Sequence, residues 1–530
     1  MHASPPTIHA SVPFEGSLCS HLCSHLIESR KPDALSQCPA GRTLHTVPDI
    51  RIRPVNKAPV NPNGDFVLYW MIAARRVESN FGLQRAVERS TELARPLVVL
   101  EALRCGYPWA SDRLHRFIMD GMIDNRDRLQ GKPVLYYPYL ERTHGEGKRL
   151  LRALAEQACS IVTDDYPAFF LPRMVEAAGK LVPVRLEAVD SNGILPMAAA
   201  DRVFLTAFSF RRFLQGQLKE HLGSVPKKDP FARASLPPPP GLSKKLMKRW
   251  PPATEALLHA DTRGLRAFAI DHRVEPSPIR GGAAEASAAL TRFLRARLER
   301  YAEEGNHPDS EVTSGLSPYL HFGHISSHEI FSRLARHEKW SPRNLANKAT
   351  GGRSGWWRMS EGAERFLDQV ITWRELGYNM CSKRRDYAEF DSLPEWARET
   401  LLKHARDPRP QIYSLAEFEA ARTHDPLWNA AQRQLLREGR IHNYLRMVWG
   451  KKILEWSPSP RQALSIMIEL NDKYALDGRD PNSYSGIFWT LGRYDRPWAP
   501  ERPIFGKVRY MSSRSTERKL RLRNYLSQYG

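Results

Sequence analysis

The sequence predicts an α/β domain with a doubly wound parallel sheet, followed by an all-helical domain. Between residue 66 and about residue 200, short apolar runs alternate with amphipathic stretches. This alternation is typical of successive strand–helix–strand units. The remainder of the chain shows helical spacing of its apolar residues, and ten of the thirteen tryptophans lie at or beyond Trp340. The aromatic chemistry is therefore expected in the second domain.

Five mostly apolar runs predict the strands of the first domain. They are FVLYW (66–70), PLVVL (96–100), PVLYY (133–137), SIVT (160–163) and VRLEAV (184–189). Runs of this kind indicate strands buried on both faces, as in a parallel sheet covered by helices. No Gly-x-Gly-x-x-Gly pattern follows the first run, so the sequence lacks a dinucleotide-binding fingerprint.

The C-terminal part combines aromatic rings, amides and charges at helical spacing. Trp449 and Trp456 are seven residues apart, so they share one helix face. Trp428 lies near the start of the preceding helix, which Gly439 is expected to end. A Ser-Pro-Ser-Pro sequence at 457–460 predicts the next helix, running to about residue 472. A packed core would be mostly Leu, Ile and Val, so this mixture favours a site for a redox-active ring.

These patterns divide the chain into four segments. Residues 1–49 are predicted to be a disordered extension, 50–205 an α/β domain, 206–285 an interdomain linker and 286–530 a helical domain. The linker contains four consecutive prolines, which favour a stiff, extended chain. The first segment also contains Cys19, His21, Cys23 and His25, which are an alternative, less favoured metal site. No metal site is predicted elsewhere.

The composition favours a polyanionic partner. There are 79 Lys and Arg against 58 Asp and Glu, which gives a formal net charge of +21. An excess of this size is typical of nucleic-acid-binding proteins, although it can also serve solubility alone. The segment 502–523 carries eight Lys or Arg and one Glu, and it is either a solvated helix face or a phosphate-contacting tail.

Six cysteines form no Cys-x-x-Cys pair, which predicts a reducing, cytoplasmic environment. No apolar run approaches the length that spans a bilayer, so no membrane partner is expected. The N-terminus lacks the apolar core of a signal peptide.

Three separated segments carry a family resemblance. They are TSGLSPYLHFGHIS (313–326), DGRDPNSYSGIFW (477–489) and FGKVRYMS (505–512). Together with the tryptophan-rich helices, they resemble the photolyase/cryptochrome family, and specifically the class II cyclobutane pyrimidine dimer photolyases. The match runs from about Phe66 to the C-terminus. Several motifs in the right order are far more specific than one short pattern.

The resemblance implies a monomer with a Rossmann-like first domain and FAD in the helical domain. Blue light excites the reduced flavin, which passes an electron to a pyrimidine dimer that the protein has flipped out of DNA. In some members the first domain also holds an antenna chromophore, a deazaflavin or a folate.

The resemblance also assigns the flavin site. The phosphate and ribose segment corresponds to Tyr301, Thr313, Ser314, Leu316 and Ser317. Small hydroxyl residues and their backbone N–H groups suit a pyrophosphate at a helix start, although an isolated Thr-Ser-x-Leu-Ser pattern is equally an ordinary helix cap.

Five further residues are expected around the flavin ring. Asn471 is expected to face the flavin N5, supported by a charged pair of Arg446 with Asp495. Asp477 and Asp480 are candidates for the ring N3–H and the ribose. The alternative for Asp480 is a structural helix cap.

Three tryptophans correspond to the electron relay of class II members. They are Trp449, Trp428 and Trp456. Indole rings can be oxidised reversibly, and neighbouring rings allow short electron hops from the surface. Without the resemblance, three tryptophans at this spacing would more often be core packing.

The lesion pocket is expected between Trp373 and Trp489, with Met447 beneath the dimer. Flat indole rings stack on flipped bases without demanding a sequence. The remaining matches are residues that contact DNA beside the lesion. They are Arg496, Trp498, Lys507 and Arg509.

One catalytic position departs from the family pattern. Family repair enzymes carry a glutamate four residues before Trp373, where this chain has Gln369. Asp368 lies one residue along the helix and is expected to point elsewhere. Glutamine keeps a hydrogen-bond donor and acceptor but cannot supply a proton. This departure leaves two functions open: dimer repair with a reduced yield, or a cryptochrome-type blue-light receptor with weak or no repair.

Overall fold

The computed structural model describes residues 46–530. The candidate metal residues Cys19, His21, Cys23 and His25 lie outside the described residues. The folded part begins slightly before the predicted boundary at residue 49: Val47 is buried, and its backbone N–H donates to Glu88 Oε1 at 3.1 Å.

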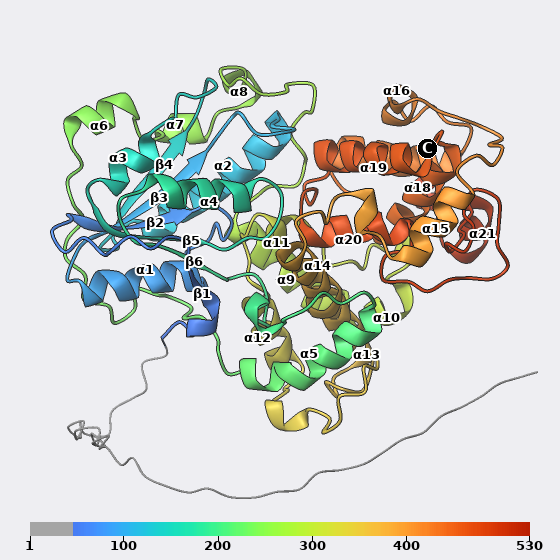
Figure 1. The fold of residues 1–530 in the computed structure, drawn as a ribbon, viewed down its shortest axis with the longest axis horizontal. Helices are drawn as coiled ribbons and strands as arrows, with labels where there is room; N and C mark the ends of the chain where they lie inside the picture. The colour runs from blue at the N-terminus through green and yellow to red at the C-terminus, as the bar shows by residue number, and fades with distance from the viewer. Residues whose placement is uncertain (1–45) are drawn as a thin grey trace, which may run out of the picture. The chain divides into compact units, whose positions relative to one another are not determined.

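A six-stranded sheet forms the first domain, in the order β1-β6-β5-β2-β3-β4 (Figure 1). The strands are β1 (Ile52–Pro54), β2 (Phe66–Met71), β3 (Leu97–Leu103), β4 (Leu135–Leu140), β5 (Ala158–Asp164) and β6 (Leu186–Val189). All five predicted strands are confirmed, and their pairings are parallel. Strand β1 was not predicted; it is only three residues long and pairs antiparallel with β6 at the sheet edge.

Alternation along β2 explains why both faces of the sheet are covered. Phe66, Leu68 and Trp70 pack into one apolar cluster, together with residues of α3 (Leu150–Ala155) and α4 (Leu171–Leu181). Val67 and Tyr69 point to the other face, in a cluster with α1 (Phe81–Glu92). Helices thus cover both faces of the sheet, which is the doubly wound architecture that the apolar strands predict.

Helices form the rest of the described chain, including one between β3 and β4. Its longer helices are α2 (Asp112–Leu129), α5 (Ala207–His221), α9 (Ala283–Ala296), α12 (Ser327–His337), α14 (Arg374–Lys383), α17 (Pro426–Glu438), α18 (Asn443–Trp456), α19 (Pro460–Tyr474) and α20 (Pro481–Thr490). Shorter ones are α6 (Lys244–Arg249), α7 (Glu255–Leu258), α8 (Thr262–Leu265), α10 (Leu298–Glu304), α11 (Ser317–His321), α13 (Glu361–Leu367), α15 (Glu395–Lys403), α16 (Leu415–Glu419), α21 (Ser513–Lys519) and α22 (Arg523–Tyr529). None of the helices described between residues 46 and 530 is long and apolar enough to cross a membrane.

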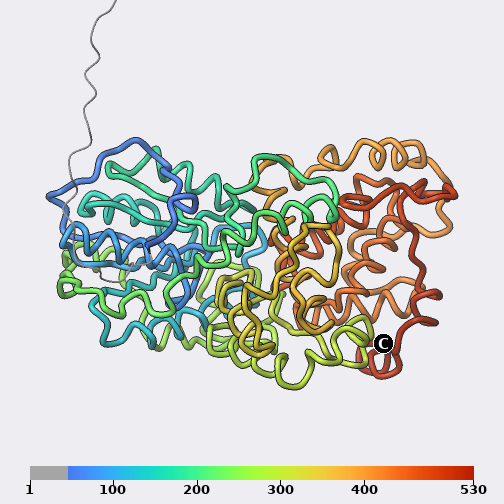
Figure 2. The backbone as a smooth tube through the Cα atoms, turned by 90° about the horizontal axis from the view of Figure 1, so that it is seen from below, coloured from blue at the N-terminus to red at the C-terminus, as the bar shows by residue number. Residues whose placement is uncertain are grey.

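The predicted ends of the central helices are confirmed. Gly439 ends α17 in the left-handed conformation, with φ of 74°. Ser459 caps α19 by accepting a hydrogen bond from the backbone N–H of Gln462. The segment predicted as a linker contains α5, whose Phe210 and Leu214 pack into the same core as residues of the helical domain. Figure 2 shows the green segment that includes α5 beside the yellow-to-orange helical part.

A π-helical turn, Asp368–Trp373, joins α13 to α14. Such single turns interrupt α-helices mostly at functional sites. Asp368 is ion-paired with Arg211 of α5 at 2.8 Å, so it points away from Gln369 as expected. The Asp368 carboxylate therefore serves a structural ion pair, and the neighbouring Gln369 amide points elsewhere.

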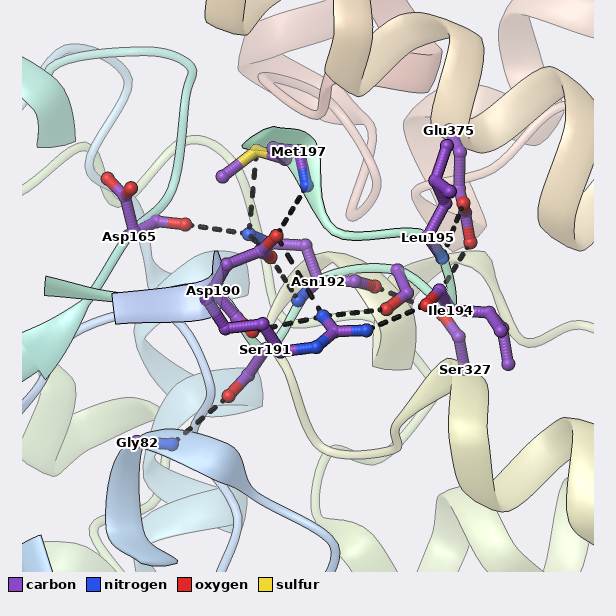
Figure 3. Close-up of polar contacts among 12 residues, drawn as sticks. Gly82, Asp165, Asp190, Ser191, Asn192, Ile194, Leu195, Met197, Ser327 and Glu375 are labelled. Carbon is purple, nitrogen blue, oxygen red and sulfur yellow. Dashed lines mark hydrogen bonds and ion pairs between the residues drawn. The ribbon is translucent and has the colours of Figure 1, made fainter. Parts of the chain in front are cut away.

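Helix α14 is fixed to the loop that follows β6. Glu375 accepts hydrogen bonds from the backbone N–H groups of Ile194 at 2.7 Å and Leu195 at 3.1 Å (Figure 3). Burial raises the pKa of Glu375 to about 7. Ser327 of α12 donates to the carbonyl oxygen of Asn192 in the same loop. The α/β part thus positions the helix that follows Trp373.

Candidate functional site

The three predicted relay tryptophans form one row. Trp428 occupies the middle, with ring centres 6.4 Å from Trp449 and 6.1 Å from Trp456. Hydrogen bonds fix the orientation of two of the rings: Trp428 Nε1 donates to the Trp449 carbonyl oxygen at 3.0 Å, and Trp449 Nε1 donates to Gln432 Oε1 at 2.9 Å. All three rings also belong to a buried apolar cluster, so core packing and relay geometry coexist here.

The outer end of the row lies under polar rings. Trp456 is itself buried, at 2% exposure. The exposed His424 ring lies 4.9 Å from it, and Tyr413 lies 5.7 Å away. The row thus runs from the inside of the helical half to a point one ring below the surface.

Asn471 presents a carbonyl oxygen that the described residues leave open. Its amide group donates to Asp472 Oδ1 at 2.8 Å and to Ser483 Oγ at 2.9 Å. Because both N–H groups are used, the network sets the orientation of the amide. The free oxygen suits an N–H donor, as at the N5 position of a reduced flavin.

The predicted pairing of Arg446 with Asp495 is wrong. Arg446 Nη2 instead donates to Asp477 at 2.9 Å, and both side chains are largely buried. Asp495 accepts from Arg509 at 3.0 Å. The turn before α20 brings Asp477 back to α18, so a nearer carboxylate takes the guanidinium. The remaining N–H groups of Arg446 have no partner among residues 46–530, which suits an anionic ring.

Asp480 is engaged by the protein itself. It caps α20 through the backbone N–H of Asn482, and its other oxygen accepts from Tyr166 at 3.0 Å. Burial alone would raise the pKa of this carboxyl, but the hydrogen bond from His321 and the charge of Arg374 outweigh burial and hold it below its usual range. The helix-cap alternative is therefore observed, and a ribose contact would have to share these partners.

The expected phosphate segment is a short turn with accessible hydroxyl groups. Thr313 and Ser314 are half-buried, and Ser317 is exposed at the start of α11. Between them, Gly315 has φ of 69°, and a Cβ atom built there meets nothing within 4 Å. A helix of five residues adds little dipole, so hydroxyl and backbone N–H groups would carry phosphate binding.

Leu316 and Tyr301 differ from the hydroxyl residues in role. Leu316 is buried at 1% exposure, so only its backbone can face a ligand. Tyr301 packs against the same apolar cluster, with Arg365 5.7 Å from its ring centre.

The predicted lesion walls come from three helices. Gln369 and Trp373 lie on the π-helical turn, and both are partly exposed. Met447 of α18 lies beside α20, with its methyl group 3.6 Å from a Cβ atom built at Gly486. Trp489, also partly exposed, lies three residues further along α20.

Trp489 belongs to a row of alternating cations and indoles. Arg509 lies 5.5 Å from the Trp489 ring centre and 4.0 Å from that of Trp498. Arg496 also lies over the Trp498 ring, 4.9 Å from its centre. Lys451 was not predicted as part of the site, but its Nζ lies 5.1 Å from the Trp489 ring centre. Its only signal was a lysine within an apolar helix.

Lys507 lies beside this row but has its own partner. Its ammonium group lies 3.6 Å from Glu501. Half of its side chain is exposed, so it can reach a phosphate at the surface.

A separate cavity of about 620 Å³ lies at the carboxyl ends of the parallel strands. Its apolar lining includes Trp70, Tyr107, Phe169, Phe170 and Met174, and its polar lining includes Arg75, Glu141, His144, Lys148 and Arg479. The carboxyl edge of a doubly wound sheet is the usual ligand site of this architecture. The described residues contain no cluster of His, Cys, Asp or Glu that could hold a metal ion.

Comparisons with known proteins agree on one family. Over 481 residues the chain is 36% identical to a deoxyribodipyrimidine photo-lyase of Methanothermobacter thermautotrophicus, covering 90% of this chain and 97% of that protein. It is 31% identical to the photo-lyase of Potorous tridactylus over 85% of this chain and 79% of the relative. It is 30% identical to the photo-lyase of Arabidopsis thaliana, over 90% of this chain and 92% of that protein. No family model matches the sequence.

The fold agrees with this assignment. A solved bacterial class III photolyase from Agrobacterium tumefaciens superimposes with a TM-score of 0.57 over 88% of this chain and 86% of that one, at 18% identity. At this identity the likeness shows the fold alone. Together with the sequence identities, the two-domain fold establishes that the chain belongs to the photolyase family.

Proposed function

We propose that this protein repairs cyclobutane pyrimidine dimers in DNA, driven by blue light and using reduced FAD, as a class II photolyase. The observation that carries the proposal is the tryptophan row, whose inner end lies on the same helix as Arg446 and Met447. A row of oxidisable rings that ends beside a bound flavin would serve to reduce it. The enzyme is accordingly a carbon–carbon lyase.

The flavin-binding residues would divide the cofactor between them. When bound, reduced FAD supplies the electron that light makes available for opening the cyclobutane ring. Asn471 would accept a hydrogen bond from the ring edge through its free oxygen, and Arg446, held by Asp477, would balance negative charge on the ring. Thr313, Ser314 and Ser317 would hold the phosphates. Trp449, Trp428 and Trp456 would return the flavin to its reduced form.

The lesion-binding residues act by shape and polarity. Trp373 and Trp489 would stack against the flipped dimer and exclude water, with Met447 beneath. Gln369 can donate and accept hydrogen bonds at the dimer carbonyl and N–H groups. It stands where the family has glutamate, so the radical anion would be stabilised by a neutral amide alone.

The DNA backbone would be held by the exposed and partly exposed cations beside Trp489. Arg496, Lys507 and Arg509 supply charge, and Trp498 supplies a flat ring between two of them. Contacts of this kind carry affinity but no sequence preference.

The cavity in the α/β domain suits an antenna chromophore. Its aromatic walls favour a flat ring system, and its charged groups at the rim favour a polar tail. A deazaflavin or a folate would both satisfy this chemistry, and reconstitution with each separates them by absorption.

A cryptochrome-type photoreceptor is the second candidate, and Gln369 is the residue that favours it. The relatives named above are all photo-lyases, so the comparisons favour repair. We further propose a cytoplasmic monomer, divided at residues 205 and 285 as the sequence suggests.

Illumination of the reduced protein with DNA that contains a thymine dimer tests the function. We expect dimer loss under blue light and none in the dark. A light yield equal to the dark control, with reduced flavin bound, would contradict repair and favour the photoreceptor.

A further inference from the structure

The ammonium group of Lys451 is buried directly behind Trp489, a predicted wall of the lesion pocket. The residue has 0% exposure in the middle of α18. Its Nζ donates to the carbonyl oxygen of Thr490 at 2.6 Å and lies 5.1 Å from the centre of the Trp489 ring. This separation is within the range of a cation–π interaction, about 6 Å.

No carboxylate among the described residues forms an ion pair with Lys451. The charged groups that act on it are Asp495, which favours its protonated form, and Arg509, which disfavours it. Asp495 is already bound to Arg509 at 3.0 Å. Burial is the main effect, and it lowers the pKa of Lys451 to about 7. A buried lysine with so little compensation is costly for folding, and such groups concentrate at functional sites.

Trp489 is consequently flanked by two cations. Lys451 approaches it from inside the protein, and Arg509 lies 5.5 Å from the ring centre on the more exposed side. Two cations at one indole restrict the ring and make removal of an electron from it more difficult. Their positive potential also reaches the space that the ring borders.

We propose that Lys451 is a positioning and electrostatic residue of the lesion pocket, which holds Trp489 and stabilises negative charge on the dimer during repair. The proposal rests on the proposed function. An electron passes from reduced flavin to the dimer, two carbon–carbon bonds of the cyclobutane ring break, and the electron returns to the flavin. Lys451 transfers no proton during this cycle. A nearby positive charge lowers the energy of the dimer radical anion and so favours ring opening over premature electron return.

The charge of Lys451 matters because Gln369 lacks the ionisable carboxyl group that glutamate would have. The amide can bind the dimer but cannot give it a proton. A cation behind the opposite wall supplies part of the stabilisation of negative charge without touching the substrate.

The neighbouring Lys452 offers a matched control. It is also largely buried, with 8% exposure, and its Nζ lies 5.2 Å from the ring centre of Trp456. It differs in having an ion-pair partner, Glu455, at 2.7 Å. Two adjacent lysines thus lie beside tryptophans with different expected roles, one at the lesion and one at the relay.

The test compares Lys451→Met and Lys452→Met with the unmodified protein. The flavin is reduced chemically, so that the relay is not needed, and the substrate is a single-stranded oligonucleotide with one thymine dimer. The repair quantum yield and the dissociation constant in the dark are measured at pH 6 and pH 8.5. Lys451→Gln is a second variant that keeps a donor toward the Thr490 carbonyl, should the methionine variant fail to fold.

We expect the yield of the unmodified protein to fall from pH 6 to pH 8.5 as Lys451 loses its proton. Lys451→Met should be about three- to tenfold lower at pH 6 and should change little with pH. Lys452→Met should repair as the unmodified protein does. Glu375→Gln should leave the pH profile intact, which separates Lys451 from the other buried group that titrates near pH 7.

Three results would overturn the proposal. They are an unchanged yield in both Lys451 variants, a retained pH dependence in them, or an equal loss in Lys452→Met. Should the unmodified protein show no repair at any pH, the proposed function fails, and the dark affinity decides the role of Lys451. In the dark, the preference of the protein for the dimer-containing over the undamaged oligonucleotide should then still weaken with rising pH, but only in proteins that retain Lys451. Equal pH profiles with and without Lys451 would refute the proposal.

Discussion

The indole rings of Trp428 and Trp449 lie parallel within 4°, with their centres 6.4 Å apart. A hydrogen bond from Trp428 Nε1 to the Trp449 carbonyl oxygen joins the two residues across α17 and α18. Core packing alone does not require this alignment. The parallel rings make Trp428 the connection between the inner Trp449 and the outer Trp456.

Replacing Trp428 with Phe should interrupt light-driven reduction of the flavin. We expect the photoreduction rate to fall by about tenfold or more, because the variant lacks the oxidisable indole in the middle of the row. Absorption of the oxidised flavin under blue light and an external reductant measures this rate. Repair with chemically reduced flavin should be unchanged, and Trp340→Phe, which packs against a different core cluster, should leave both unaltered.

Replacing Gln369 with Glu should raise the repair yield. A polar interaction of about 1–3 kcal/mol in the pocket corresponds to a factor of roughly 5 to 150 in one step. Asp368→Asn is the matched control, because Asp368 contacts Arg211 and not the pocket. Dimer loss per absorbed photon measures the effect, and no gain from the glutamate would mean that position 369 does not face the dimer.

Replacing Asp477 with Asn should loosen the flavin. Arg446 would lose its partner, and we expect flavin affinity to fall by about 5- to 150-fold, which corresponds to about 1–3 kcal/mol. Asp495→Asn should retain flavin and weaken DNA binding instead, since Asp495 holds Arg509. Flavin fluorescence on dilution measures release, and equal release from both variants would argue against the pairing observed here.

Glu375 should make stability depend on pH between about 4.5 and 7. Burial raises its folded pKa from 4.5 to about 7, so the folded state retains a proton that the unfolded state has lost. The stabilising contribution is therefore present below pH 4.5 and disappears as the pH rises to 7, by about 3 kcal/mol at most. Glu375→Gln should show a smaller fall in urea midpoint from pH 5 to pH 7.5. An unchanged slope would place the titration elsewhere.

DNA affinity should decrease steeply with salt. Three phosphate contacts from Arg496, Lys507 and Arg509 predict a slope of about 2 to 3 in log Kd against log salt. Arg509→Met should reduce the slope by about 1, whereas Lys245→Met, on the exposed α6, should not. Binding of dimer-containing duplex at several salt concentrations measures it, and a flat dependence would remove phosphate contacts from the account.

The architecture could be predicted because its signals are local. Continuous apolar runs such as 66–70 must be buried on both faces, and Gly439 and Ser459 mark helix ends by their own backbone and side-chain chemistry. The strand β1 escaped prediction because a three-residue edge strand carries no pattern of its own.

The site was predicted less completely because its partners are set by tertiary contacts. Sequence spacing cannot show that the turn before α20 brings Asp477, and not Asp495, to Arg446. Nor can it show that Lys451 is buried, because its surroundings come from Trp489 and Thr490 on another helix. Residues within one helix, such as Trp449 and Trp456, were the most predictable.

Flavin content tests the central claim most directly. The proposed flavin lies in the helical half, next to Trp449, Asn471 and Arg446. Denaturation of purified or reconstituted protein should release about one FAD per chain, identified by its absorption and fluorescence. Colourless protein that releases no flavin, and takes up none on reconstitution, would contradict the account.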